Sequence, residues 1–280
     1  RRPAGPDLTS LFIGGGGLFG VITNIWMRLG PKPKEEKWAL VVFQSLHGAA
    51  KAAQKIYYQG IYPTWMDLCD EKKGQACFSR LEIDVPRGPC LIIRTSGCMP
   101  GEATWKLEKL IETCNEEKTL EIRTIEEKEW PQRSGADPEK SALERRNWIS
   151  IGEYVDPPLS KYVDIIDEMQ EKMVAAVGDK ARAARFSFSG WGPLVMWPMI
   201  NILRNAWDVL KPETKEELEN MQIWRDYWAA YGRSSVGFFP SYAECWKAHY
   251  GPTSYRLLKG LKRLFDPKNI LNPTNIPQEG

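Results

Sequence analysis

Glycine residues dominate one short stretch of this chain and limit its fold more than any other feature. Residues 14–17 are all glycine, Gly20 follows, and apolar runs flank them at 11–13 and 21–27. Glycine lacks a Cβ, so this stretch can adopt positive φ angles and let backbone N–H groups approach a ligand closely. Such N–H groups suit a pyrophosphate. The other interpretation is a tight turn between two apolar segments.

The residues around the glycines exclude two common nucleotide-binding motifs. A Walker-type phosphate loop needs Gly-Lys-Ser/Thr, which does not follow here. A Rossmann fingerprint needs a helix after the glycines, whereas residues 21–27 are rich in β-branched side chains. We therefore expect a strand after the glycines.

The two ends of the chain carry a resemblance to a known family. Asp7-Leu-x-x-Leu-Phe-Ile-Gly-x-x-Gly-x-x-Gly-Val-Ile-Thr23 resembles D-L-x-x-L-F-x-G-S-E-G-T-L-G-I-V-T of FAD-linked oxidases, the vanillyl-alcohol oxidase or PCMH-type superfamily. The most similar branch holds D-lactate dehydrogenase and the glycolate oxidase flavoprotein subunit. Leu258-Lys-Gly-Leu-Lys-Arg-Leu-Phe-Asp-Pro-Lys-Asn-Ile-Leu-Asn-Pro273 is similar to that branch's closing pattern, K-x-x-h-D-P-x-x-I-L-N-P-G, where h is apolar.

The resemblance implies an α+β fold and an FAD cofactor. Residues 1–33 would end a PCMH-type FAD-binding domain, 34–225 would form a ferredoxin-like mixed cap domain, and 226–280 would return as helices to the flavin. In the family about half of the FAD domain precedes the glycine segment, so we expect either that this chain is a fragment or that the rest of the FAD domain lies on another chain. The implied FAD contacts are Gly14, Gly17, Gly20, Val21, Ile22 and Asn272.

Composition limits the partners and the location. Lys and Arg number 38 against 36 Asp and Glu, and this balance argues against nucleic acid as the main partner. No apolar run approaches the roughly 20 residues that span a bilayer. Six scattered cysteines fit a reducing cytosol, so we expect a cytoplasmic protein. Twelve tryptophans indicate a large core or, alternatively, an aromatic pocket or docking face.

Hydrophobic periodicity predicts a split α+β layer of the ferredoxin-like type in the first half of the chain. The expected strands are 38–43, 61–68, 77–85, 90–95 and 119–125, and the expected helices are 46–58 and 102–117. Beyond them we expect strands at 148–155 and 185–189 and helices at 157–177, 212–231 and 254–265.

The branch's metal-binding signatures are not intact in this chain. Its H-x-G-D-G-N-h-H motif aligns with residues 188–195, where Phe188 and Val195 replace the histidines and Trp191 replaces the aspartate. Its G-x-x-S-x-E-H-G motif aligns with 232–239, where Gly237 and Phe238 replace the glutamate and histidine. Apolar side chains offer a divalent cation no ligands, so we predict no metal.

Other residues supply candidates for substrate chemistry. Trp130-Pro-Gln-Arg133 fits a Trp-x-x-Arg motif whose arginine, by the resemblance, pairs with a substrate carboxylate; a solvated loop arginine is the alternative. Tyrosine can act as an acid or base when its pKa is lowered, and Tyr231, Tyr242 and Tyr250 lie near the lost histidine motif. We take Tyr242 as the candidate catalytic residue, with Arg233 as its charge partner. Phe188, Trp191 and Phe238 would line an aromatic substrate pocket or simply fill space.

Two functions follow from this reading. The first is an FAD-dependent oxidoreductase that oxidises a small hydroxy acid or alcohol by hydride transfer to flavin and passes electrons to a protein acceptor. The alternative is a non-catalytic flavoprotein subunit, with a closed substrate site, that completes the FAD site and docks an electron-transfer partner.

Overall fold

The chain folds as two compact units in the computed structural model. The structure describes residues 8–13, 15–71, 86–125, 148–152, 158–177, 184–191, 195–203, 208–219 and 243–273. One unit comprises residues 1–29, 153–155 and 220–280, and the other comprises residues 30–152 and 156–219. The domain boundaries expected from the sequence stay a prediction.

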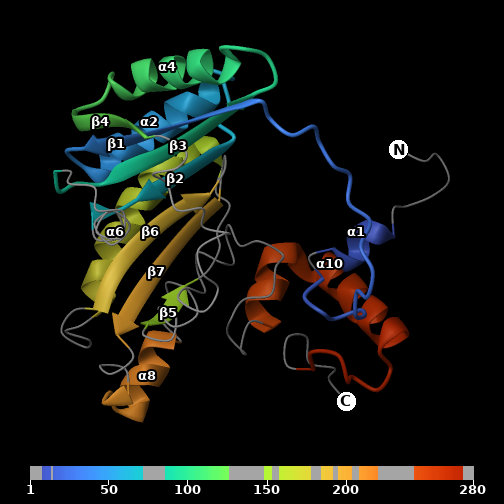
Figure 1. Ribbon diagram of the computed structural model, residues 1–280. Helices are drawn as coiled ribbons and strands as arrows, with labels where there is room; N and C mark the ends of the chain where they lie inside the picture. Colours follow the sequence, from blue (N-terminus) through green and yellow to red (C-terminus); the bar gives the residue numbers. More distant parts are fainter. Residues whose placement is uncertain are drawn as a thin grey trace. The chain divides into compact units, whose positions relative to one another are not determined.

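A seven-stranded sheet forms the framework of the larger unit, in the order β4-β1-β3-β2-β6-β7-β5 (Figure 1). All of its neighbouring strand pairs are antiparallel. Its strands are β1 (Glu35–Phe43), β2 (Trp65–Cys69), β3 (Cys90–Gly97), β4 (Thr119–Ile125), β5 (Trp148–Gly152), β6 (Ala184–Trp191) and β7 (Val195–Leu203).

The first part of this sheet confirms the predicted ferredoxin-like layer. Helix α2 (Leu46–Tyr58) connects β1 to β2, and α4 (Glu102–Cys114) connects β3 to β4. The four strands stand in the order β4-β1-β3-β2, so each helix crosses over from one strand to another that is not its neighbour, the pattern of split βαβ units.

Helix α2 has the predicted bounds because its start and its buried face are both encoded locally. The Ser45 side chain caps the helix by accepting a hydrogen bond from the Gly48 amide at 3.1 Å. Its buried residues repeat with helical spacing: Leu46, Ala49, Ala50, Ala52, Ala53, Ile56 and Tyr57. The small alanines let the helix approach the sheet closely.

Contacts along β3 show which face of the sheet α4 covers. Thr95 Oγ1 donates a hydrogen bond to the Ala103 carbonyl at 2.8 Å, and a Cβ added at Gly97 would lie 2.7 Å from the Glu102 Cβ. Since side chains alternate between the two faces of a strand, Thr95 and Gly97 share the helix-covered face, and Arg94 lies on the opposite face.

The face opposite α4 is also largely buried. A core cluster lies on it, at exposures of 9% or less: Trp38, Leu40, Val42, Cys69, Cys90, Ile92 and Ile125. Strand β1 is consequently buried on both faces from Trp38 to Phe43, which explains its nearly continuous apolar sequence.

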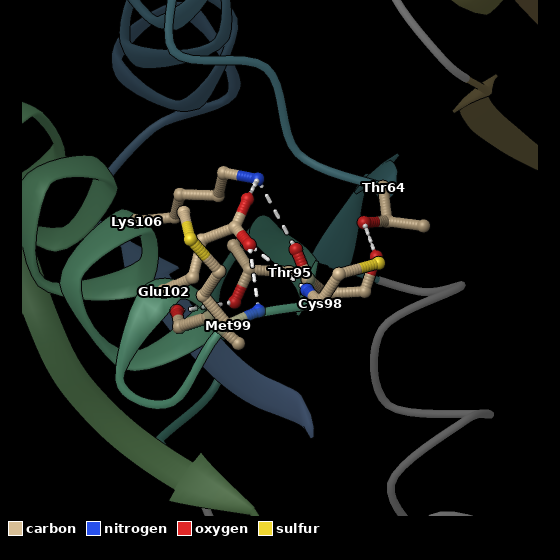
Figure 2. A network of polar contacts seen from close by, with 8 residues as sticks. Thr64, Thr95, Cys98, Met99, Glu102 and Lys106 are labelled. Carbon is tan, nitrogen blue, oxygen red and sulfur yellow. Dashed lines mark hydrogen bonds and ion pairs between the residues drawn. The ribbon is translucent and has the colours of Figure 1, made fainter. Parts of the chain in front are cut away.

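A polar network holds the turn between β3 and α4 (Figure 2). The Glu102 carboxylate accepts hydrogen bonds from the amides of Cys98 (2.8 Å) and Met99 (3.2 Å), and Lys106 Nζ donates to it at 2.6 Å. Lys106 also donates to the Ser96 carbonyl. The Lys106 hydrogen bond and the two amides lower the pKa of Glu102 to about 2.

Several predicted boundaries differ from the structure. Strand β2 begins at Trp65 and not at residue 61, because Pro63 has no amide for the ladder. Helix α4 ends at Cys114 and not at residue 117, since the Glu116 amide turns back to the Thr113 carbonyl. The strand expected at 77–85 lies outside the described residues.

Strand β7 was missed because Pro198 lies within it. Proline lacks the amide that a central strand needs on one side. Among the described residues Pro198 pairs with Phe188 of β6 alone, because the described pairing of β5 with β7 begins one residue later, at Met199. The position of the proline at the end of a neighbouring strand makes it tolerable.

Helices and a turn complete the described chain. Helix α6 (Tyr162–Val177) follows a 3-10 turn, η2 (Leu159–Lys161), and packs against α2, while α8 is Pro212–Glu219. Helix α10 (Ala243–Phe265) is interrupted at Gly251, whose φ of 73° suits glycine, so the prediction captured only its second segment. None of the described helices is long and apolar enough to cross a bilayer.

We expect Glu102→Gln to lower the urea midpoint of unfolding at pH 7, because the amide removes the charge that Lys106 and two backbone amides stabilise. A carboxylate with a lowered folded-state pKa contributes stability that is complete above its ordinary pKa, roughly 4.3, and is lost as pH falls through about 2. The difference from wild type should therefore shrink between pH 4 and pH 2, as followed by circular dichroism.

The matched control is Glu112→Gln on the same helix, where the carboxylate is exposed and pairs with Lys109 at 2.7 Å. Exposed pairs of this kind contribute little. Equal urea midpoints for the Glu102 variant and wild type at pH 7 would contradict the role assigned to this network.

Candidate functional site

The glycine segment forms a tight turn in the smaller unit. It follows the short helix α1 (Thr9–Phe12), and the Leu18 amide donates to the Gly15 carbonyl at 3.0 Å. Gly16 and Gly17 have φ angles of 58° and 72°, which only glycine adopts without strain. The amides of Gly16 and Gly17 donate to no acceptor in the described part of the chain, so they are available to an anion.

Apolar contacts fix this turn against helix α10. Leu18 and Phe19 are buried and form a cluster with Leu11, Phe12, Tyr250, Tyr255, Leu258 and Leu261. Phe12 and Phe19 also meet the Phe265 ring edge to face, at centroid distances of 5.4 and 6.1 Å. The glycine turn and the C-terminal helix are therefore one folded unit, although about 240 residues separate them in sequence.

The C-terminal tail reaches the glycine turn directly. Asn272 Nδ2 donates a hydrogen bond to the Gly16 carbonyl at 2.8 Å. Asn272 has a φ of 41°, a conformation that asparagine tolerates better than most residues. The contact orients the carbonyl of the same glycine whose amide is available.

A buried ion pair shapes the tail before Asn272. The Lys262 side chain is completely buried, and its Nζ contacts Asp266 Oδ2 at 2.5 Å and donates to the Leu271 carbonyl. The Asp266 carboxylate accepts hydrogen bonds from the amides of Ile270 (2.9 Å) and Leu271 (2.7 Å). These contacts close a compact turn after α10.

Asp266 remains ionised in this arrangement. Burial alone raises the pKa of a carboxyl group, but the hydrogen bonds from Lys262, Ile270 and Leu271 outweigh it and hold the pKa of Asp266 below its ordinary value. A charged, hydrogen-bonded pair is the form in which two buried charges are tolerated.

The segment after the glycine turn is apolar and exposed. We expected a strand at 21–27, but residues 21–29 form neither strand nor helix. Exposed fractions are 77% for Val21, 72% for Ile25, 99% for Trp26 and 88% for Leu29. The β-branched composition was therefore not sufficient for a strand, because a strand also needs a neighbour with which to pair.

The structure brings together some of the predicted site residues. Gly17, Gly20, Val21, Ile22 and Asn272 lie in one unit, with Asn272 bonded to the turn itself. Phe188 and Trp191 lie on β6, where Trp191 is paired with Asp67 of β2 and Val195 of β7. The remaining candidates lie outside the described residues: Gly14, Arg133, Arg233, Phe238 and Tyr242.

Sequence reasoning assigned no role to Gly16, Lys262 or Asp266. The signal for the ion pair was present, since Lys262 and Asp266 are four residues apart around the end of a basic helix. In the described part of the chain no His, Cys, Asp and Glu side chains gather as a metal-binding group.

Comparison with known proteins gives the family. The family described as FAD linked oxidases, C-terminal domain, matches residues 32–221 and 241–276. The chain belongs to this family. The match covers nearly all of the larger unit and part of the smaller one, and it confirms the resemblance drawn from the sequence.

Curated relatives agree in sequence along nearly the whole chain. Glycolate oxidase subunit GlcD of Bacillus subtilis (strain 168) is 25% identical over 283 residues, covering 96% of this chain and 57% of the relative. D-lactate dehydrogenase [cytochrome] 1, mitochondrial, of Saccharomyces cerevisiae is 23% identical and covers 99% of this chain and 48% of the relative. The chain spans about half the length of these relatives.

Solved structures agree in fold. A p-cresol methylhydroxylase with substrate bound superposes with a TM-score of 0.64 at 16% identity, over 97% of this chain and 58% of that one. An alkyldihydroxyacetonephosphate synthase gives a TM-score of 0.61, also at 16% identity, over 98% of this chain and 50% of that one. The α+β fold predicted from the sequence, with its PCMH-type relatives, is confirmed.

We expect Asp266→Asn to speed hydrogen exchange at the amides of Ile270 and Leu271, because the neutral side chain no longer offers them a charged acceptor and leaves Lys262 buried without its counter-ion. In wild type the same protection should be complete above the ordinary aspartate pKa, roughly 3.9, and be lost as pH falls through the lowered folded-state pKa. Peptide-resolved exchange mass spectrometry measures both effects.

Lys262→Met and Arg263→Met form a matched pair of controls on adjacent residues. Both remove one positive charge, but Lys262 is fully buried and Arg263 is exposed. Only the Lys262 variant should accelerate exchange in residues 266–273. Equal behaviour of the two variants would show that charge, and not the buried contact, shapes the tail.

Proposed function

We propose that this chain is the C-terminal, cap-bearing part of an FAD-dependent oxidoreductase. The observation that supports this most directly is the hydrogen bond from Asn272 to Gly16, which brings the tail motif to a glycine turn with available amides. Membership of a family of FAD linked oxidases supports the cofactor.

The residues of the turn fit the pyrophosphate of FAD. Among the described residues the amides of Gly16 and Gly17 meet no acceptor, their backbone has positive φ, and a Cβ built at Gly17 meets nothing within 4 Å. Such a turn can hold phosphate oxygens. Gly14, Gly20, Val21 and Ile22 would contribute further contacts, and Asn272 would hold the turn in shape. When bound, flavin accepts a hydride from the substrate.

The exposed apolar segment 21–29 supports the proposal that another protein segment packs against this unit. Contiguous exposed apolar side chains mark surfaces that another protein segment covers. We propose that this segment packs against the remainder of the FAD-binding domain, supplied by the same polypeptide or by a partner chain. The chain's coverage of only about half of its relatives fits this proposal.

The substrate and the electron acceptor are proposed here from the names of the relatives. The names of two relatives point to glycolate and to D-lactate with a cytochrome, so we propose a small hydroxy acid or alcohol as reductant and a protein as electron acceptor. The aromatic residues Phe188, Trp191 and Phe238 would favour an apolar substrate body, with Arg133 on its carboxylate, Tyr242 as the base and Arg233 beside it. A cytoplasmic location also stays a prediction.

We expect the purified native assembly to carry FAD near one equivalent, and Gly17→Val to reduce that amount strongly. A β-branched side chain at a φ of 72° strains the backbone and crowds the amides that would hold phosphate. The absorbance spectrum, followed by chromatography of the cofactor released on denaturation, measures the content.

Gly60→Val is the matched control, because Gly60 has a φ of 77° but follows α2 in the other unit. It should destabilise the protein by a similar amount and leave the FAD content unchanged. A folded native assembly without flavin would refute the proposed function. Bound FAD that neither glycolate, D-lactate nor an aromatic alcohol reduces under anaerobic conditions would favour the non-catalytic subunit.

A further inference from the structure

Three residues with complementary chemistry lie side by side across the centre of the sheet. The strand register pairs Arg94 of β3 with Trp38 of β1 on one side and with Trp65 of β2 on the other. Directly paired residues project from the same face of a sheet. An arginine is therefore flanked by two tryptophans on the face opposite α4.

The Arg94 guanidinium lies against an aromatic ring. Its Cζ is 5.1 Å from the centre of the Trp38 ring, close enough for a cation–π contact. Trp38 is only 9% exposed, so its ring forms a fixed wall. The Arg94 side chain itself is 28% exposed, and a small molecule can therefore reach it.

The hydrogen-bonding capacity of Arg94 is left unused. Its Nε atom is buried without an acceptor. The carboxylate of Glu36 is 3.9 Å from Nη1, which is beyond hydrogen-bonding distance. In the described part of the chain the guanidinium donates no hydrogen bond, although it carries five N–H groups in a planar fork.

We propose that Arg94, Trp38 and Trp65 form a binding site for a small carboxylate with an apolar or aromatic body. A guanidinium fork binds a carboxylate through two parallel hydrogen bonds, and the tryptophan rings contact the rest of the molecule. The inference rests on the proposed function, in which an organic hydroxy acid is the expected ligand, and it makes Arg94 a carboxylate-binding residue of the larger unit that the sequence motifs did not reveal.

Glu36 gives the site a distinctive electrostatic signature. It stands two pairs further along the ladder than Trp38, opposite Ser96, and among the described residues its carboxylate lies within 4 Å of Arg94. An incoming anion is attracted by Arg94 and repelled by Glu36. A site for anions therefore predicts opposite effects of neutralising these two residues, whereas a purely structural ion pair predicts loss of stability from both.

The test compares two probes that differ by one carboxylate, mandelate and benzyl alcohol, on the native FAD-bound assembly. Dissociation constants come from tryptophan fluorescence, and the rate of anaerobic flavin reduction measures oxidation of the bound probe. We expect Arg94→Gln to weaken mandelate binding about 10- to 100-fold, as for a lost charge-assisted pair, and to change benzyl alcohol binding less than about twofold. Arg94→Lys should fall between, because it keeps the charge without the fork.

Glu36→Gln should tighten mandelate binding, by about two- to fivefold as expected for a partly exposed charge. Arg87→Gln, in the exposed turn before β3, removes the same charge as Arg94→Gln and should leave both dissociation constants unchanged. Melting curves of all variants check folding, and Glu36→Gln keeps the test decisive if Arg94→Gln does not fold.

The site proposal is overturned if wild type does not bind mandelate, if Arg94→Gln weakens both probes equally, or if Glu36→Gln weakens mandelate binding. Failure of the Arg94 site can be distinguished from failure of the proposed function. If the assembly binds mandelate through Arg94 but does not oxidise it, mandelate is not a substrate and the binding site stands. If mandelate is oxidised at the same rate with and without Arg94, the oxidoreductase function stands and the Arg94 site is refuted.

Discussion

Burial of both faces of the central strands is the constraint on which the larger unit depends. Strand β1 is buried from Trp38 to Phe43, and β3 is buried from Cys90 to Ile93. Backbone groups in so dry a place must be paired, and β1 achieves this by bonding to β3 on one side and β4 on the other. Helices α2 and α4 then need only an apolar stripe to cover one face, which their alanine and leucine positions provide.

The smaller unit depends on a different balance. An apolar cluster holds its glycine turn against α10, and polar contacts that satisfy one another shape the tail that follows the helix. Lys262 can be buried because Asp266 and the Leu271 carbonyl accept hydrogen bonds from its ammonium group, and the tail bends because Asp266 also accepts hydrogen bonds from two backbone amides. The bend delivers Asn272 to Gly16. A chain of short contacts thus connects the end of α10 to the glycine turn.

Local signals in the sequence predicted those parts of the fold that are locally determined. The bounds of α2 were right because Ser45 and the alanine spacing encode them. The ferredoxin-like order of strands and helices followed from segments whose hydrophobic periodicity switches between that of a strand and that of a helix. Strand β7 was missed because only the register of its neighbour makes Pro198 acceptable. The strand at 21–27 was wrong because the residues supply β propensity but the described structure supplies no partner strand.

The candidate site divides in the same way. The glycine turn and Asn272 were predictable, since each depends on residue types that few others replace, namely glycine at positive φ and a short amide. Arg94 was not predictable, because no motif surrounds it and its meaning arises only when register places Trp38 and Trp65 on either side. The surroundings of the Arg94 guanidinium are formed by β1, β2 and β3 together. In a flavoprotein the cofactor carries the redox chemistry, so substrate recognition can rest on such cross-strand groupings, while cofactor binding depends on short continuous motifs.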